Sequence, residues 1–503
     1  MSDLDYLAIL RLAAPEAILT ATVLAVLLIE FGALHGESVP QRNVPAMAVG
    51  LIGIAAAAFW LGFASDAGRL AGGLLVLDPP GRLIKLALLF LGGATLVLSL
   101  GQRFTEHVGE YVALLLLAII GMLLLVSTED TLMLYVALEL TSLSLYILAA
   151  LDRRDPQSTE AALKYFLFGG TAAAFLLFGL SLLYGLTGTT QLVPMAKELS
   201  GHLADPLHWV AVIFIVAGFG FKLAAVPFHL WAPDTYAGAP TLVTGLIASG
   251  SKVASVAVFA KVLLLGLAGS EGGADWARWR TGWTPLIATL AVASLLLGNL
   301  AALAQSRVKR LLAWSAIAHA GYLLTGLVAL ADPPRRADAY AATLFYVITY
   351  AVATLGALGV IAAIERSHGD DRMERFAGLG RRDPVLAVAL LIFLLSLAGI
   401  PPLAGFFGKF YVFATVLRVA PPAFGLLWLV LLGVGLTPVA LYYYLVVLKQ
   451  AFVCPPPPGT PPTPSTLGEQ IPLIVLALVV VGLGIAPSLL VTPLLATFQA
   501  AGW

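Results

Sequence analysis

Long apolar segments recur along almost the whole chain, and their length constrains the fold more than any other feature. A helix needs about 20 apolar residues to cross a bilayer, where only helices and closed barrels satisfy their backbone hydrogen bonds. We count fourteen such segments, and 60% of the residues are hydrophobic while 11% are charged. The sequence therefore predicts an all-α polytopic membrane protein.

The fourteen predicted spans are joined mostly by short polar loops, and no soluble domain is expected between them. The N-terminal residues are not basic and lack a small-residue cleavage site, so the first span is expected to be retained rather than removed as a signal peptide. The predicted spans are 12–34, 44–64, 81–101, 109–127, 130–151, 161–186, 208–231, 239–268, 283–305, 311–331, 339–365, 385–417, 424–448 and 470–494.

The lysines and arginines of the loops indicate the orientation of the chain. With the N-terminus outside, thirteen of the 28 basic residues lie on the inner side and ten on the outer side. Because fourteen is an even number, both termini are then expected outside, and the bias toward Ala, Leu and Gly suggests a bacterial cytoplasmic membrane. The five basic residues assigned to the spans are Lys164, Lys222, Lys252, Lys261 and Lys409.

An internal repeat becomes visible when the sequence is shifted by 180 residues. Spans 4–8 then correspond to spans 9–13, and because five is odd the second copy must be inverted, as in many transporters. Chance similarity between two Leu- and Ala-rich stretches is the alternative. The aligned pairs are Asp152 with Asp332, Tyr165 and Phe166 with Phe345 and Tyr346, Gly179 with Gly359, and Glu139 with His319.

The repeat divides the chain into four parts. These are residues 1–108 with spans 1–3, residues 109–268 with the first repeat, residues 283–448 with the second repeat, and residues 449–503 with a Pro-rich loop and span 14.

Several classes of function find no support in the sequence. The formal net charge is zero, which gives no indication of nucleic-acid binding. The single cysteine, Cys454, excludes a disulfide framework and a cysteine-ligated iron–sulfur cluster within this chain. The GxGxxG, GxxxxGK[ST] and HExxH signatures of nucleotide and zinc sites do not occur.

The stretch 219–252 combines two lysines with prolines inside apolar sequence. Lys222 and Lys252 flank Pro227, Pro233 and Pro240. An ionisable side chain at membrane depth costs roughly 2.5–3.5 kcal/mol, and proline breaks the helical hydrogen-bond ladder. Costly lysines beside a proline-broken seventh span predict an ion or proton path.

Glu139, in the middle of the fifth span, has no loop nearby to hydrate it, and Lys222 is its expected partner. A static buried ion pair that fixes helix packing is the alternative. Lys252 is flanked by Gly250, Ser251 and Ser255, which leave room for water, and loss of hydration makes its ammonium group easier to deprotonate. We therefore predict that all three side chains carry protons.

Lys409 lies in the twelfth span, which Pro401 and Pro402 break. This span occupies the position in the second repeat that the seventh span occupies in the first. His319, at the repeat position of Glu139, is a candidate proton carrier or a hydrogen-bonded packing residue, and His229 presents the same choice.

Two further lysines lie nearer the ends of their spans. Lys164 is either an accessory member of the path or a side chain that extends to the interface. Lys261 follows Lys252 by nine residues, roughly 13 Å and half a turn away on a helix, and is expected to face away and extend to the interface.

Four stretches together resemble a known family: residues 218–240, the span that contains Glu139, residues 299–324, and residues 396–413 followed by LYYYL at 441–445. The chain is similar to the antiporter-like proton-translocating subunits of respiratory complex I, and most similar to the N-type subunit. The resemblance extends from span 4 to span 13. The chain lacks the lateral helix of the L-type subunit, and its span 12 carries lysine where the M-type subunit has glutamate.

This resemblance implies fourteen spans with two inverted five-helix repeats and a working proton channel. It places the family's functional positions on Glu139, Lys222, Lys252 and Lys409, with Lys164 as an accessory. It also implies that FMN, iron–sulfur clusters, NADH and quinone are bound by partner subunits. The partners implied are M-type and K-type neighbours and the lateral helix of an L-type subunit, besides membrane lipid.

Three alternatives share parts of this pattern. A subunit of an Mrp-type sodium/proton antiporter or of a membrane-bound hydrogenase would carry the same buried Glu and Lys residues. An assembly scaffold with an inactive channel is the third, although retention of all five ionisable positions argues against it.

Overall fold

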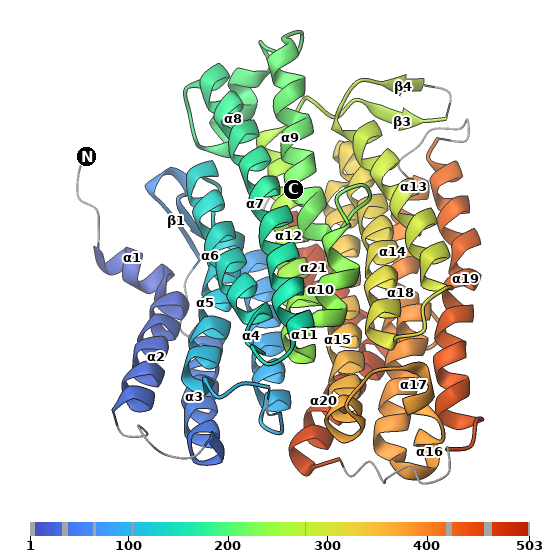
Figure 1. Cartoon of the computed structure of the whole chain (residues 1–503). Coiled ribbons are helices and arrows are strands. Elements are labelled where there is room, and N and C mark those ends of the chain that lie inside the picture. The colour runs from blue at the N-terminus through green and yellow to red at the C-terminus, as the bar shows by residue number, and fades with distance from the viewer. Residues whose placement is uncertain are drawn as a thin grey trace.

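The computed structural model is a bundle of long, roughly parallel helices (Figure 1). It describes residues 6–32, 39–63, 67–102, 104–276, 278–418, 425–456 and 465–500. The first eight predicted spans are formed by α2 (Ala14–Phe31), α3 (Val39–Phe63), α4 (Pro79–Ser99), α5 (Val108–Val126), α6 (Thr131–Ala149), α7 (Pro156–Thr187), α9 (Pro206–Leu223) with α10 (Trp231–Gly238), and α11 (Thr241–Ala248) with α12 (Gly250–Lys261).

The remaining six spans follow in the same way. They are formed by α13 (Trp283–Ala302), α14 (Val308–Val328), α15 (Arg336–His368), α17 (Pro384–Ala398) with α18 (Ala404–Arg418), α19 (Leu427–Phe452), and α20 (Leu467–Ile485) with α21 (Ser488–Ala500). Among the described residues, thirteen helices are long and apolar enough to cross a membrane. The fourteenth crossing is the pair α17 and α18, each of 15 residues, so the prediction of an all-α polytopic membrane protein is confirmed.

Smaller elements close the ends of the bundle. The helices among them are α1 (Tyr6–Leu12), α8 (Leu192–Leu199) and α16 (Leu379–Arg382), with a π turn η2 (Val262–Gly266) and 3-10 turns η1 (Ala71–Gly73), η3 (Ala329–Ala331), η4 (Pro333–Arg335) and η5 (Met373–Phe376). Two antiparallel hairpins are β1 (Gly68–Leu70) with β2 (Leu75–Leu77), and β3 (Gly273–Asp275) with β4 (Arg278–Arg280).

The β3–β4 hairpin lies at one end of the bundle, drawn at the top of Figure 1, which we call the hairpin end; β1 is drawn at the left, beside the upper part of α6. The opposite end carries the loops 150–155, 303–307 and 369–378, and we call it the basic end. Part of the predicted Pro-rich loop, residues 457–464, lies outside the described residues.

Asp-Pro pairs start four of the long helices. In each, the aspartate side chain accepts a hydrogen bond from a backbone N–H of the first turn, and the proline occupies a position whose N–H has no helical partner anyway. These pairs are Asp78–Pro79 of α4, Asp155–Pro156 of α7, Asp205–Pro206 of α9 and Asp383–Pro384 of α17.

The seventh and twelfth spans are broken, as predicted. α9 ends where Ala224 adopts φ +58°, and α17 ends where Gly399 adopts φ +89°. In both, a backbone N–H then bonds five residues back, from Ala225 to Gly220 and from Ile400 to Leu395. This is the hydrogen bond of a helix ending in a left-handed residue, and the prolines that follow prevent the helix from continuing.

Two further interruptions were not predicted. Span 8 is interrupted at Ser249, between α11 and α12, and span 14 is interrupted at Pro487, between α20 and α21. Span 8 contains no proline after its first residues, so its sequence gave no clear signal of a break.

The centre of the bundle is formed by spans 8, 10 and 11. In the most apolar 18-residue windows of 241–266 and 333–368 every residue is buried, and in that of 308–331 94% are, against 44% or less for α2 and α3. α12, α14 and α15 therefore have no face left for lipid, and polar groups on them lie inside protein.

The four-part division of the chain and its inverted repeat stay predictions.

Candidate functional site

Lys222 lies in the last turn of α9, directly before the break, and its side chain is buried. Its Nζ donates a hydrogen bond to Ser142 Oγ on α6, one turn from Glu139 on the same helix. The rings of Tyr146 and Phe221 lie 5.9 and 5.4 Å from Nζ. The structure thus brings Lys222 next to the helix of Glu139, but with Ser142 as its hydrogen-bond acceptor.

Glu139 is partly buried. Its Oε1 is enclosed, and no described residue donates a hydrogen bond to it. A buried carboxylate oxygen without a partner is costly, and rotation toward the ammonium group of Lys222 would relieve that cost. The predicted pair is therefore present as two neighbours that are not in contact. The structure shows this pair in a separated arrangement.

Lys252 lies in the first turn of α12, immediately after the interruption at Ser249, and is only 1% exposed. Its Nζ donates to the carbonyl of Ala316 on α14 at 2.8 Å and lies 5.5 Å from the ring centre of Tyr350 on α15. An ammonium group over an aromatic face is stabilised by about 0.5–2 kcal/mol. Lys252 therefore has neutral partners, and no carboxylate of the described residues pairs with its ammonium group.

His319 lies on α14, one turn beyond Ala316, and its two ring nitrogens face two tyrosine hydroxyls. Nδ1 is 2.6 Å from Tyr346 Oη and Nε2 is 3.3 Å from Tyr444 Oη. The Tyr350 ring, which also faces Lys252, is 4.7 Å from the imidazole. A neutral imidazole accepts a proton at one nitrogen while donating from the other, so this position can pass protons between hydroxyls.

Lys409 lies on α18, after the break in span 12, and is buried. Its Nζ turns back to the end of α17, where it donates to the carbonyls of Leu397 at 3.1 Å and Ala398 at 3.0 Å. The ring of Tyr322 lies 4.7 Å from Nζ, and that ring also contacts His319. The last carbonyls of a helix carry partial negative charge, which favours a cation there.

These contacts form one continuous buried line in the second half of the chain. It runs from Lys252 over Tyr350 to His319 and over Tyr322 to Lys409. Four of the six predicted site residues, Glu139, Lys222, Lys252 and Lys409, lie in or beside broken spans, and His319 lies between the last two. The arrangement can hold and transfer protons.

Lys164 lies apart from this line. Its Nζ is 2.8 Å from Asp234 on α10 and 2.6 Å from Glu160, and Asp234 also pairs with Arg310. The side chain of Lys164 is 36% exposed. This four-residue network joins α7, α10 and α14 near the basic end, so the structure shows Lys164 as part of a partly exposed ion-pair network.

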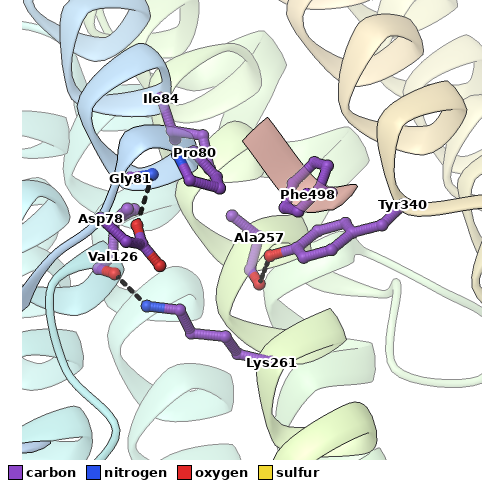
Figure 2. Close-up of a pocket in the computed structure, with 9 residues that line it drawn as sticks. All are labelled: Asp78, Pro80, Gly81, Ile84, Val126, Ala257, Lys261, Tyr340 and Phe498. Carbon is purple, nitrogen blue, oxygen red and sulfur yellow. Dashed lines mark hydrogen bonds between the residues drawn. The ribbon is translucent and has the colours of Figure 1, made fainter. Parts of the chain in front are cut away.

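The prediction that Lys261 extends to the interface is wrong. Its side chain is 4% exposed, and Nζ donates to the carbonyl of Val126 at the end of α5 at 2.7 Å. Figure 2 shows it at a small pocket, with Asp78 and Tyr340 on the other walls. The end of a neighbouring helix supplies the acceptor that we had expected from water or lipid headgroups.

Lys85 is wholly buried on α4 and pairs with Glu16 of α2 at 2.7 Å. His229 lies in the break of span 7, 6% exposed, and faces the ring of Trp314 at 5.5 Å. Neither Lys85 nor His229 touches the buried line.

The aromatic members of the line are the main residues that the sequence did not reveal. Tyr443 and Tyr444 are both buried, and Tyr444 bonds to Ser315 and faces His319. The repeat alignment of Tyr346 with Phe166 was the one available signal. No signal in the sequence pointed to Ser142, because serine is common in membrane-spanning helices.

No group of three or more His, Cys, Asp or Glu side chains that could hold a metal ion occurs among the residues that the structure describes. The one cysteine, Cys454, is unpaired.

Comparison with known proteins agrees with this geometry. The family model described as "NADH:quinone oxidoreductase/Mrp antiporter, TM" matches residues 128–437, which include Glu139, Lys222, Lys252 and Lys409. "NADH-quinone oxidoreductase subunit N 2" of Acidobacterium capsulatum is 48% identical over 97% of this chain and 99% of its own length. "NADH-quinone oxidoreductase subunit N" of Moorella thermoacetica is 40% identical, over 87% and 88%.

Solved structures with the same fold come from more than one kind of complex. A chain of respiratory complex I from Thermus thermophilus with bound aureothin has a TM-score of 0.76 and 33% identity, with 95% of this chain and 98% of that chain covered. A chain of the Mrp complex from Dietzia sp. DQ12-45-1b has a TM-score of 0.79 at 20% identity, with 97% of each covered, and shows the fold alone. Because the family model covers more than half of the chain and the relatives align along most of it, the chain belongs to the NADH-quinone oxidoreductase subunit N family.

Proposed function

We propose that this chain carries protons across the bacterial cytoplasmic membrane as the N-type membrane-arm subunit of complex I. Electron transfer from NADH to quinone, in partner subunits, drives the transport. The observation that supports this most strongly is the buried line from Lys252 through His319 to Lys409. A row of lysines enclosed by protein at membrane depth is costly and indicates a proton path.

The side chains of Glu139 and Lys222 together act as the switch of this path. In the separated arrangement Lys222 has only a hydroxyl and aromatic rings around it, so its ammonium group loses the carboxylate that would stabilise it. It then gives up a proton toward Lys252. When Glu139 closes onto Lys222, the charged form is favoured again, and the lysine is reprotonated from the inner side.

The second half of the path carries the proton outward. Lys252 transfers it across the tyrosine-lined region to His319, and from there it reaches Lys409, which releases it on the outer side. The helix end at Leu397 and Ala398 holds the protonated Lys409 until release.

The orientation and the partners complete the proposal. The excess of basic residues at the basic end supports an inner location for that end, and fourteen crossings then place both termini outside. FMN, iron–sulfur clusters, NADH and quinone are assigned to partner subunits. M-type and K-type subunits are the proposed neighbours, with the lateral helix of an L-type subunit alongside.

Replacement of the switch lysine tests the proposed function. Lys222→Ala in the assembled complex should lower proton translocation in vesicles several-fold, with NADH oxidation measured in parallel. Unchanged translocation at equal assembly would refute a role in the path.

Purification in mild detergent tests the assignment to complex I, because flavin, iron–sulfur signals and NADH–quinone activity should copurify with the chain. Membrane partners without redox centres, together with sodium-dependent exchange, would instead indicate an antiporter.

A further inference from the structure

A wide basin opens at the basic end of the bundle. Its volume is about 1530 Å³, and it is lined mainly by residues from the loops that join spans 3 to 4, 5 to 6, 7 to 8 and 9 to 10. Polar side chains and backbone groups make up much of its wall, among them Thr241, Lys309 and Glu365. The basin therefore brings bulk water close to the start of α11, the first half of the span that carries Lys252.

An ion pair lies at the wall of this basin, directly at the start of α11. Glu365, near the end of α15, accepts a hydrogen bond from the Thr241 hydroxyl, and its other oxygen is 3.2 Å from Lys309 Nζ. Lys309 also donates to the carbonyl of Ala239 at 3.2 Å. The Lys309 side chain is 5% exposed and that of Glu365 is 22% exposed, so the carboxylate is the member that faces the basin.

Two other carboxylates, Asp370 at this wall and Asp371 directly behind it in the chain, are occupied in a different way. Arg375 donates two hydrogen bonds to Asp370 and lowers the pKa of that carboxyl group below its usual value, so Asp370 keeps its charge. Asp371 is wholly enclosed between the guanidinium of Arg307 and the backbone N–H of Lys309. Glu365 is the carboxylate that is both open to the basin and bonded to the helix leading to Lys252.

Three buried hydroxyl groups continue inward from this point. Tyr236 Oη, Tyr350 Oη and Thr354 Oγ1 are enclosed by protein. The side chains of Tyr350 and Thr354 lie next to each other, and none of the three groups makes a hydrogen bond of good geometry within the described residues. Tyr236 lies on α10, beside the link to α11, and its carbonyl accepts from Thr244, one turn beyond Thr241. Buried hydroxyls without protein partners are sites where ordered water is expected.

The geometry of α15 aligns these groups. Glu365 and Thr354 are eleven residues apart, which is about 16 Å along a helix and within roughly 20° of the same face. Tyr350 is one further turn away and faces both Lys252 and His319. Leu358 and Ile361 lie between, both fully buried, so the route has an apolar section that water must enter for protons to pass.

We propose that Glu365 takes up protons from the basin and supplies them to Lys252 through Thr241 and the hydroxyls of Tyr236, Thr354 and Tyr350. This inference rests on the proposed function, because it gives Lys252 a second supply that bypasses Glu139 and Lys222. In each cycle Glu365 binds a proton, returns to the carboxylate when the proton leaves, and Lys252 becomes an ammonium group. Lys309 stabilises the carboxylate between cycles.

Substitution of Glu365 in the assembled complex, reconstituted in vesicles, tests this route. Glu365→Gln keeps the size and the acceptor for Thr241 but cannot take up a proton, so proton translocation per NADH oxidised should fall several-fold. Glu365→Asp, which retains the carboxylate, should keep most of it. Lys252→Ala serves as the reference for the proposed function itself.

The outcomes separate the two ideas. If Glu365→Gln translocates protons like the unmodified protein while Lys252→Ala does not, the supply route is refuted and the proposed function stands. If Lys252→Ala also translocates normally, the proposed function fails. Should Glu365→Gln impair assembly, Thr354→Val decides, because it replaces only a hydroxyl by a methyl group.

Thr349 provides the matched control for Thr354. Both lie on α15 and are at most 2% exposed, but the Thr349 hydroxyl already donates to the carbonyl of Phe345 at 2.9 Å. Thr354→Val should lower translocation several-fold, whereas Thr349→Val should not. Equal translocation in the two variants would overturn the route.

Discussion

The two broken spans place their lysines on opposite sides of the break. Lys222 precedes the break in span 7 and reaches across to a neighbouring helix, where Ser142 accepts its hydrogen bond. Lys409 follows the break in span 12 and turns back to the carbonyls of Leu397 and Ala398 on the other half of its own span. The two spans share a break of the same geometry but give their ammonium groups different partners.

This difference indicates different roles. The carbonyls at the end of α17 are fixed by the backbone, so they favour a protonated Lys409 at all times. The partner of Lys222 is a side chain, and Glu139 beside it can approach or withdraw. Rotation of the Glu139 side chain can therefore remove the stabilisation of a protonated Lys222. No side-chain rotation can remove the carbonyls that stabilise a protonated Lys409. A switch belongs at Lys222 and a holding site at Lys409.

The largest effect expected from this comparison is that of Lys409→Arg. A guanidinium keeps the positive charge and the hydrogen bonds to the helix end, but it does not deprotonate in proteins. If Lys409 must release its proton, the variant should assemble normally and lose most proton translocation, roughly tenfold or more as for other groups that carry protons. Proton translocation and NADH oxidation in reconstituted vesicles measure this.

Lys85 is the control for that substitution. It is as deeply buried as Lys409, but it is paired with Glu16 and lies outside the buried line. Lys85→Arg retains the charge of a static pair and should leave translocation per NADH oxidised unchanged in whatever complex assembles. An equal loss of proton translocation in the two variants would mean that arginine disturbs packing. That result would contradict the role of Lys409 as a site that holds and releases a proton.

Gly399→Ala should have the next largest effect. Gly399 has φ +89°, and a Cβ there would lie 3.1 Å from Lys409 Cδ. The left-handed backbone costs a residue with a side chain about 1–2 kcal/mol, and Lys409 must also move away from the helix end. We expect lower thermal stability together with several-fold lower translocation; a stable complex with normal translocation would show that the position of Lys409 is not critical.

The sequence predicted those residues of the site that are unfavourable inside an apolar helix whatever their neighbours are. Lys222, Lys252 and Lys409 are conspicuous because charges inside apolar spans are rare, and Pro227 and Pro401 reveal the breaks because proline ends helices. These signals do not depend on knowing which helices are neighbours.

The parts that were missed depend on packing between distant segments. Tyr322 and Tyr350 are ordinary core residues until α14, α15 and α18 are placed around His319. The prediction for Lys261 was wrong because this residue lies near the end of its span, where water is the usual partner, whereas the fold supplies the carbonyl of Val126 instead. Only the three-dimensional arrangement could have revealed that acceptor.

Ala224→Gly should have the smallest effect and sharpens the comparison of the two breaks. Ala224 holds the left-handed position in span 7 at φ +58°, where Gly399 holds it in span 12. Glycine would relieve roughly 1 kcal/mol of backbone strain, but it would add about 0.4–1 kcal/mol of conformational entropy to the unfolded chain. These two contributions nearly cancel.

We therefore expect the melting temperature of the Ala224→Gly complex to change little and its proton translocation to stay normal. The measurement is a thermal unfolding curve beside the same vesicle assay. If translocation falls although stability is unchanged, the alanine restricts the end of α9 so that Lys222 stays within reach of both Ser142 and Glu139. In that case the stiffness of the first break is itself part of the switch, and the second break, which already has glycine, does not need it.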